Sequence, residues 1–279
     1  MSEIKSFAIE KLALNEKYPT QIRSIGRITD LKVYDERLQP SQKAPMNNNF
    51  LLVSDFTNDM IYQLSLDTND VQAIDSRIRN PTGVAYDHTR KRVVWGSTED
   101  NAIFSVSVNG TDETCLFSTG DKFPEMFAID FSTGNIYYTA VRLYTLASHQ
   151  EGYIGVLSVN SLHKLLIKDL RSPRGIALYP SKGLMFWTDF GSNPHIGRAQ
   201  MDGQESIEII NTGVTFPNGL AMDFSANRLY WTDGGTDKIQ SCNLNGSDRL
   251  EILSDSGAFL MDIAFDNTGN LYYTAWNRP

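Results

Sequence analysis

The groups in this chain best suited to chemistry are six polar side chains that recur at one point of an internal repeat. Each stands just before the glycine of a Pro-x-Gly pattern, or at the matching place of a weaker copy: Asp30, Thr82, Glu125, Arg174, Asn218 and Asp262. Carboxylates, a guanidinium, an amide and a hydroxyl cannot be buried together without partners, so they pair, hold water or hold a ligand. They suit capture of a cationic group, or acid and base catalysis on a small molecule.

The repeat that positions these residues is clearest at 216–233, where the sequence reads FPNGLAMDFSANRLYWTD. Aligning the copies on the tryptophan of this motif gives positions that are 42, 43, 49, 44 and 42 residues apart: Val53, Trp95, Tyr138, Trp187, Trp231 and Tyr273. A regular period of this length indicates an array of equal modules.

Each module contains four short strands. In the best copy they are expected at 220–223, 228–232, 238–244 and 249–253, separated by turn-forming residues. The sixth copy stops after two strands, and segments 4–9 and 18–22 match the missing pair. The sequence therefore predicts an all-β, six-bladed β-propeller with four antiparallel strands per blade. The N-terminal strands close the last blade, residues 1–279 form one domain, and the six polar residues ring the entrance of the central channel.

Two tetrapeptides carry a family resemblance: Phe186-Trp-Thr-Asp189 and Tyr230-Trp-Thr-Asp233, with weaker copies at 137–139 and 272–274. They resemble the YWTD propeller of the low-density lipoprotein receptor (class B repeats). The resemblance implies that the motif aromatic packs between neighbouring blades and that the motif aspartate binds backbone groups of the adjacent turn. It also implies a ligand-binding propeller that captures a protein segment or a small molecule at the channel entrance.

Aromatic residues extend the predicted ligand site beyond the polar ring. Phe123, Phe216 and Phe259 stand just before channel positions, and Trp276 closes the same face. The gap of 49 residues marks an insertion at 141–151, which brings Tyr144 to the entrance side. Such an insertion is expected to act as a cap or a contact surface.

An enzyme is the alternative reading of the same channel. Gluconolactonases and strictosidine synthase are six-bladed relatives, and Asn218 and Asp262 resemble two gluconolactonase metal ligands that would suit Ca²⁺ or Mg²⁺. The remaining ligands of that set are not matched, so no cofactor is the main expectation. A metal-free enzyme would use Glu125, Asp262 and Arg174 for isomerisation, cyclisation or hydrolysis, with the pKa of Glu125 raised by burial. A third possibility is a structural scaffold.

Composition limits the partners. The 279 residues include 25 basic and 33 acidic side chains, a net charge of −8, which disfavours nucleic acid and anionic membranes. We expect a monomer that binds a protein or a small molecule and does not insert into a membrane. The N-terminus is not a signal peptide, so the chain is either intracellular or, as the resemblance implies, extracellular after removal of a signal.

Several residues have simpler expected roles. Cys115 and Cys242 are predicted to be buried thiols, and the four histidines, His88, His149, His163 and His195, to lie at the surface. Asn109-Gly-Thr111 and Asn245-Gly-Ser247 match both a hairpin turn and a glycosylation acceptor. Both readings stay open, with the turn favoured.

Overall fold

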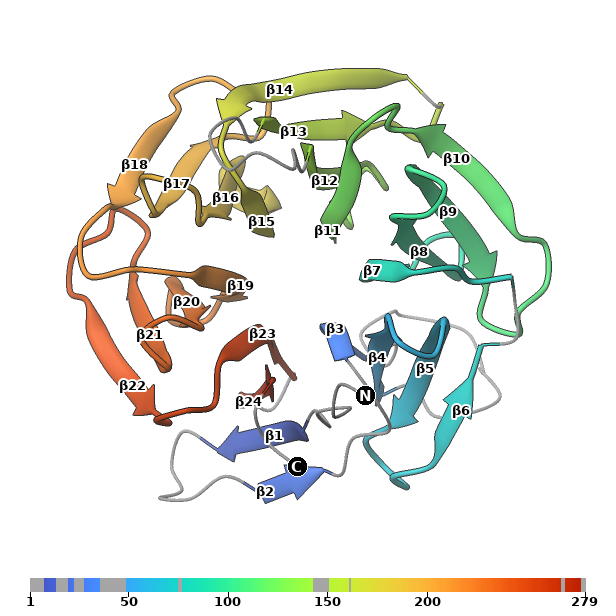
Figure 1. Ribbon diagram of the computed structural model, residues 1–279, viewed down its shortest axis with the longest axis horizontal. Coiled ribbons are helices and arrows are strands. Elements are labelled where there is room, and N and C mark those ends of the chain that lie inside the picture. The colour runs from blue at the N-terminus through green and yellow to red at the C-terminus, as the bar shows by residue number, and fades with distance from the viewer. Residues whose placement is uncertain are drawn as a thin grey trace, which may run out of the picture.

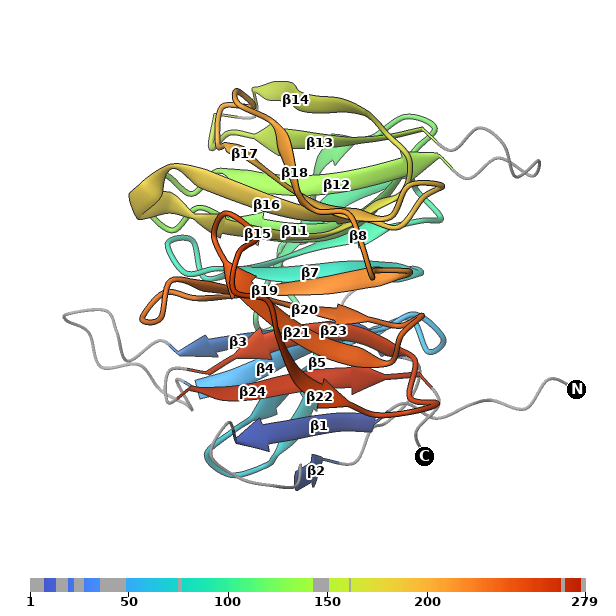
Figure 2. The same ribbon diagram turned by 90° about the vertical axis from the view of Figure 1, so that its left-hand side faces the viewer.

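The computed structural model describes residues 8–13, 20–22, 28–35, 49–74, 77–142, 151–160, 162–266 and 269–276, with side chains from residue 50 onward. The strands pair into six four-stranded sheets. Figure 1 shows these sheets set around a central axis, and Figure 2 shows the disc edge-on, with strands running across its thickness. The predicted all-β propeller of four-stranded antiparallel blades is therefore confirmed.

The sheets are numbered by their inner strands, which lie nearest the axis in Figure 1. Sheet 1 contains β3 (Ile28–Asp35), β4 (Asn49–Asp55), β5 (Met60–Ser65) and β6 (Val71–Ala73). Sheet 2 contains β7 (Pro81–Asp87), β8 (Arg92–Ser97), β9 (Ala102–Ser107) and β10 (Thr114–Ser118). Sheet 3 contains β11 (Phe123–Ile129), β12 (Ile136–Arg142), β13 (Glu151–Leu157) and β14 (His163–Leu170).

Sheet 4 contains β15 (Pro173–Tyr179), β16 (Leu184–Asp189), β17 (His195–Gln200) and β18 (Ile207–Ile210), with a short 3-10 turn at Pro180–Lys182. Sheet 5 contains β19 (Pro217–Asp223), β20 (Arg228–Asp233), β21 (Lys238–Asn243) and β22 (Leu250–Ser254). The described residues include no helix that is long and apolar enough to cross a membrane.

Sheet 6 combines strands from both ends of the chain. Its inner strands are β23 (Leu260–Phe265) and β24 (Asn270–Ala275), followed by β1 (Ala8–Ala13) and β2 (Thr20–Ile22). β1 runs antiparallel to β24 from Ala8 opposite Ala275 to Ala13 opposite Asn270. The sequence placed this strand at 4–9 with Ile4 matching Ile239, whereas Ile9 lies opposite Thr274 as Ile239 lies opposite Thr232, so the pairing segment lies five residues further along.

The motif aromatics pack between sheets. Trp231 shares a buried cluster with Phe186 and Ile196 of sheet 4, and Trp187 shares one with Met126 of sheet 3. Trp95 joins sheets 1 and 2 in the same way. The Arg249 guanidinium also lies over the Trp231 ring, 5.3 Å from its centroid. These contacts confirm that the aromatic position is structural.

The motif aspartates hold the loops that lead into the inner strands. Asp189 accepts hydrogen bonds from the backbone nitrogens of Arg171 at 2.8 Å and Ser172 at 2.7 Å. Asp233 accepts them from Thr215 at 2.8 Å and Phe216 at 3.0 Å. Each buried carboxylate therefore satisfies backbone donors where one sheet passes to the next, as predicted.

The motif threonines tie each inner strand to the next one. Thr232 Oγ1 accepts a bond from Gly219 N at 2.9 Å and donates to the carbonyl oxygen of Met261 at 2.7 Å. The same pair of bonds is made by Thr188, with Gly175 N and Asn218 O, and by Thr139, with Met126 N and Arg174 O. We call this arrangement the threonine latch.

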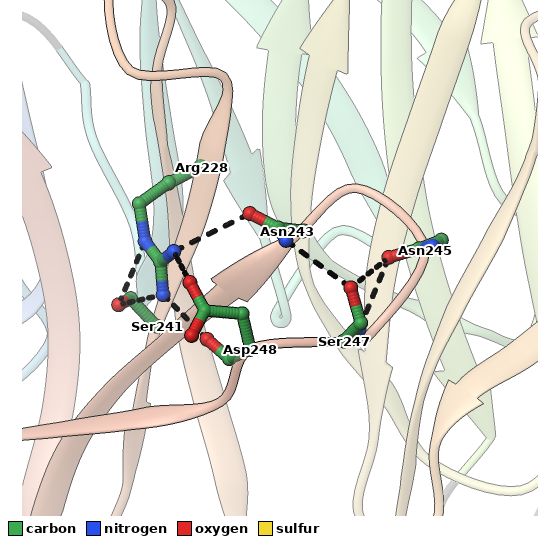
Figure 3. Close-up of polar contacts among 6 residues, drawn as sticks. All are labelled: Arg228, Ser241, Asn243, Asn245, Ser247 and Asp248. Atoms are coloured by element: carbon green, nitrogen blue, oxygen red, sulfur yellow. Dashed lines mark hydrogen bonds and ion pairs between the residues drawn. The ribbon is translucent and has the colours of Figure 1, made fainter.

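Both Asn-Gly segments form turns between the third and fourth strands of a sheet. Gly110 and Gly246 have φ values of 81° and 84°, which favour glycine. Asn245 Oδ1 accepts bonds from Ser247 N at 3.1 Å and from Ser247 Oγ at 2.7 Å (Figure 3). Arg228 fixes the end of the same turn through an ion pair of 2.6 Å with Asp248. The turn prediction is confirmed.

Two predictions about single side chains are wrong, and a third holds only in part. Cys115 is exposed, whereas Cys242 is buried as expected. His195 is buried in β17, with Nδ1 2.9 Å from the carbonyl oxygen of Asn193. His163 lies in β14 with Nε2 2.7 Å from Tyr138 Oη, and burial lowers its pKa. Both histidines lie in strands, and His163 is half-buried, so it is a surface residue only in part. His149 lies outside the described residues.

Candidate functional site

Three neighbouring inner strands bring Glu125, Arg174 and Asn218 to equivalent places at the start of the channel. The threonine latch fixes this equivalence, because the carbonyl oxygens of Arg174 and Asn218 accept the bonds from the preceding sheet. Glu125 precedes Met126, whose nitrogen donates to its own latch threonine. The predicted side-by-side placement of these three residues is thus present.

Glu125 and Arg174 carry opposite charges, and both side chains are partly accessible. Burial by the surrounding protein raises the pKa of Glu125, while the positive charge of Arg174 lowers it in part. Within the described residues, Arg174 Nε is buried without a hydrogen-bond partner. The two residues therefore offer an acidic group and the accessible part of a guanidinium to an incoming ligand.

Asn218 has a structural task in addition to its place at the channel. Its side chain is only 3% exposed, and Nδ2 donates to the carbonyl oxygen of Leu260 at 2.7 Å. Gly234 packs against this amide, since a Cβ on that glycine would lie 3.0 Å from Asn218 Nδ2. The amide nitrogen thus joins sheet 5 to sheet 6.

Asp262 does not occupy the strand position that the sequence alignment gave it. Its backbone nitrogen donates to Thr274 Oγ1 at 2.9 Å, which is the bond that Gly219 makes in sheet 5. Met261, whose carbonyl receives the latch from Thr232, takes the place equivalent to Asn218. Asp262 is 1% exposed and packs against Gly219, where a Cβ would come 2.3 Å from Asp262 Oδ1.

Asp30 is shifted in the same way. Leu31 pairs with Val53 as Leu220 pairs with Trp231, so the register of β3 places Asp30 at the Gly219 position. Asp30 and Asp262 are therefore equivalent to each other and are one residue away from the ring of Glu125 and its neighbours. Nothing further is described for the side chain of Asp30.

Thr82 has the expected strand position, but its hydroxyl is already used. Sheet 2 carries Gly96 where sheet 1 has Ser54 and the other sheets have a threonine. Thr82 Oγ1 takes over that role by donating to the carbonyl oxygen of Pro124 at 2.6 Å. Its side chain is buried. A structural bond therefore accounts for this hydroxyl.

Aromatic rings form a continuous arc on the entrance face. Phe190 lies 6.0 Å from Phe216, Phe216 lies 6.2 Å from Phe259, and Phe259 lies 5.9 Å from Trp276, measured between ring centroids. Phe216 is 41% exposed. We call these four residues the aromatic arc. It crosses sheets 4 to 6 beside the starts of their inner strands.

Phe190 was missed by the sequence analysis. It directly follows the tetrapeptide Phe186-Trp-Thr-Asp189, so the residue after each motif was the available signal. Phe123 begins β11 and is partly buried, whereas Tyr144 lies outside the described residues. Charged side chains stand beside Phe123, with Lys122 Nζ 3.6 Å from Asp121 and 3.7 Å from Glu151.

The candidate metal ligands do not make a metal site in the described part of the chain. Ca²⁺ takes six to eight oxygen ligands, whereas Asn218 directs its amide nitrogen to Leu260 and Asp262 sits one position out of register. The described residues include no group of three or more His, Cys, Asp or Glu side chains that could hold a metal ion. The donor set does not fit Ca²⁺ or Mg²⁺.

Comparison with known proteins places the fold in a family. The model for the low-density lipoprotein receptor repeat class B matches residues 227–266. The human low-density lipoprotein receptor-related protein 5-like protein is 35% identical over 189 residues, which cover 67% of this chain and 71% of that protein. The chain belongs to the low-density lipoprotein receptor class B (YWTD) repeat family.

Other class B relatives are much longer than this chain. The vitellogenin receptor Yl of Drosophila melanogaster is 34% identical over 189 residues, and the match spans 66% of this chain but 9% of the receptor. A solved nidogen/laminin complex contains a similar chain with 27% identity and a TM-score of 0.68, covering 78% of this chain and 82% of that one. A gluconolactonase from Xanthomonas campestris shares the fold at 16% identity and a TM-score of 0.67, covering 81% and 82%.

Proposed function

We propose that this YWTD propeller binds a protein segment at the channel entrance. The observation that carries the proposal is the aromatic arc, which leaves Phe216 exposed beside the inner strands that hold Glu125 and Arg174. Aromatic side chains next to charged groups are typical of the residues that dominate binding energy at protein interfaces. Protein ligands also fit the family, since the similar nidogen/laminin structure is a complex between proteins.

The site suits a segment with one apolar and one basic side chain. An apolar side chain would lie on Phe216 and Phe259, because these rings are neighbours with centroids 6.2 Å apart. A lysine or arginine would approach Glu125, where a charge-assisted hydrogen bond is stronger than a neutral one. Arg174 would then receive a carbonyl or carboxylate oxygen of the ligand. Asp30, Asp262, Phe123, Tyr144 and Trp276 remain predicted contacts of the same surface.

A peptide-selection experiment tests the proposal. Linear peptides would be selected from a random library on the intact chain, and the affinity of the enriched peptides measured by calorimetry. We expect Phe216→Ala and Phe259→Ala to weaken binding by about 10- to 100-fold, in the range of interface hot spots. Phe224→Ala is the matched control, because Phe224 is also exposed (51%) but lies at the far end of an inner strand. Equal loss in all three variants, or no enrichment, would overturn the proposal.

The enzyme alternative draws support from one observation, the raised pKa of Glu125, which would suit a general acid. Glu125, Arg174 and Asp262 are its catalytic candidates. Separate Glu125→Gln and Asp262→Asn variants distinguish the two functions. A binding site should lose affinity in steps, whereas a catalytic site should lose turnover with affinity nearly kept.

We also propose that the protein is a closed six-bladed monomer in solution, with residues 1–279 as one domain. The six residue pairs between β1 and β24 support closure, because they cover the edge that β24 would otherwise expose. Light scattering of the purified chain should give the mass of one copy, 31.3 kDa.

A further inference from the structure

The end of the channel opposite the aromatic arc contains a cavity of about 490 Å³. Its lining comes from the second halves of the inner strands β7, β11, β15, β19 and β23, and from the turns that follow them. The aromatic arc lies beside the starts of these strands, so the two features belong to opposite faces of the disc. We call this cavity the far pocket. Its volume lies within the range of small-molecule sites.

Five alanines at equivalent positions make the channel wide at this point: Ala85, Ala128, Ala177, Ala221 and Ala264. The ladders confirm the equivalence, since Ala85 pairs with Val94 and Ala221 with Tyr230, each one residue before the motif aromatic. In sheet 1 the register of β3 gives this position to Lys32, which pairs with Leu52. A methyl group on five of six strands leaves space that larger side chains would fill.

Apolar surface continues from this alanine ring to the mouth of the pocket. Phe131 and Phe224 line the pocket and are 65% and 51% exposed, although both are large apolar side chains. Leu178 and Met222 lie deeper and are buried. Exposed aromatic rings at the rim of an apolar cavity are a common mark of a ligand site.

The charged residues of the lining serve the turns. Asp223 Oδ1 accepts a bond from Ser225 N at 2.9 Å, and Asp87 Oδ1 accepts one from Thr89 N at 2.9 Å. Asp87 is also paired with Arg90 at 2.5 Å. Because these carboxylates are held by the turns, the alanine ring and its apolar neighbours dominate the inner part of the pocket. Its chemistry suits a ligand without net charge.

We infer that the far pocket binds a small, uncharged, apolar molecule. The body of the ligand lies against the alanine ring, and its outer part lies between the rings of Phe131 and Phe224. This site is separate from the entrance face, so the inference does not depend on the proposed capture of a protein segment.

Titration with the neutral fluorescent probe N-phenyl-1-naphthylamine tests the inference on the intact chain. We expect saturable binding of one probe per chain. Ala128→Leu and Ala221→Leu should each weaken it by at least tenfold, because the added carbons occupy the space of the ligand. Ala226→Leu is the matched control, since Ala226 is exposed in the turn after Asp223 and does not line the pocket. It should bind as the wild type does.

Two further comparisons keep the test decisive. Phe224→Ser leaves the alanine ring intact and should weaken probe binding several-fold, whereas Phe216→Ala on the opposite face should leave it unchanged. Thermal melts of each variant identify any that fail to fold, and the Phe224→Ser result then decides. Non-saturable binding, or equal binding by wild type and the two alanine-ring variants, would overturn the inference.

Discussion

Thr82 Oγ1 donates a hydrogen bond of 2.6 Å to the carbonyl oxygen of Pro124, across the boundary between sheets 2 and 3. In the other described bonds of this kind the donor is a hydroxyl of the second strand, a threonine in sheets 3 to 5 and Ser54 in sheet 1. Sheet 2 has Gly96 there, and a Cβ on Gly96 would come 2.6 Å from Thr82 Oγ1. In sheet 2 the donating hydroxyl therefore belongs to the inner strand β7 instead of the second strand β8, whereas the acceptor still belongs to the next inner strand, β11. Sheets 2 and 3 are thus still joined by a bond from a hydroxyl to a backbone carbonyl, as sheets 1 and 2 and sheets 3 to 6 are.

The hydrogen bond from Thr82 to Pro124 should contribute measurably to the free energy of unfolding. Thr82→Val keeps the shape of the side chain but removes the donor, leaving the buried Pro124 carbonyl without this bond. We expect a loss of about 1–3 kcal/mol in the free energy of unfolding, measured by urea denaturation. Thr82→Ser retains the hydroxyl and should lose less. If valine and serine behaved alike, the hydroxyl would not be the stabilising group.

Trp231 should be required for folding before it is required for binding. Trp231→Ala would leave a large hole between sheets 4 and 5 and remove the ring beneath Arg249. We expect a loss of about 3–5 kcal/mol, seen as a lower melting temperature. A variant that kept the wild-type melting temperature yet lost its peptide ligand would contradict this assignment.

Glu125 should make stability fall as pH rises. Its pKa in the folded chain is raised above the ordinary value of 4.5, so the unfolded chain releases this proton at lower pH than the folded chain does. The free energy of unfolding therefore decreases through the interval between the two pKa values. Glu125→Gln should melt above the wild type at pH 7 and match it near pH 4. Lower stability of the glutamine variant at pH 7 would mean that attraction to Arg174 outweighs burial.

Removal of β1 and β2 tests the closing pair. A chain lacking residues 1–22 would expose the ladder edge of β24 from Asn270 to Ala275. We expect a lower melting temperature and concentration-dependent association, because free strand edges pair with other chains. Deletion of residues 1–7 alone, which leaves both strands in place, is the control. A monomeric, equally stable product of the longer deletion would show that the pairing is dispensable.

The propeller could be predicted from the sequence because its signals are local. Alternating apolar residues, Asn-Gly turns and the tetrapeptides at Trp187 and Trp231 each report on their own few residues. The repeat period then supplied the architecture. The roles of the motif aromatics and aspartates came instead from the resemblance to the YWTD propeller.

The residues of the polar ring were harder to predict, because their positions depend on the strand register of the repeats that lack the Pro-x-Gly pattern. The sixth repeat has Asp262 at the position that Gly219 holds in the fifth repeat. Without that glycine the sequence allows two alignments one residue apart, and only the bond from Asp262 N to Thr274 selects between them. The occupied hydroxyl of Thr82 is likewise visible only beside Pro124. The glycine in Trp95-Gly96-Ser97 was the available clue. Phe190 was overlooked because its role depends on the neighbouring sheet that carries Phe216.

The Asn245 turn has a consequence for covalent modification. Ser247 binds the amide oxygen of Asn245, whereas a sugar would be attached through the amide nitrogen. The same geometry recurs at Asn109, whose oxygen accepts a bond from Thr111 N at 3.2 Å. The hairpin thus uses the amide oxygen of the asparagine, whereas a glycan would be attached to its amide nitrogen. Either asparagine can keep its place in the hairpin while carrying a glycan on the outer rim of the disc.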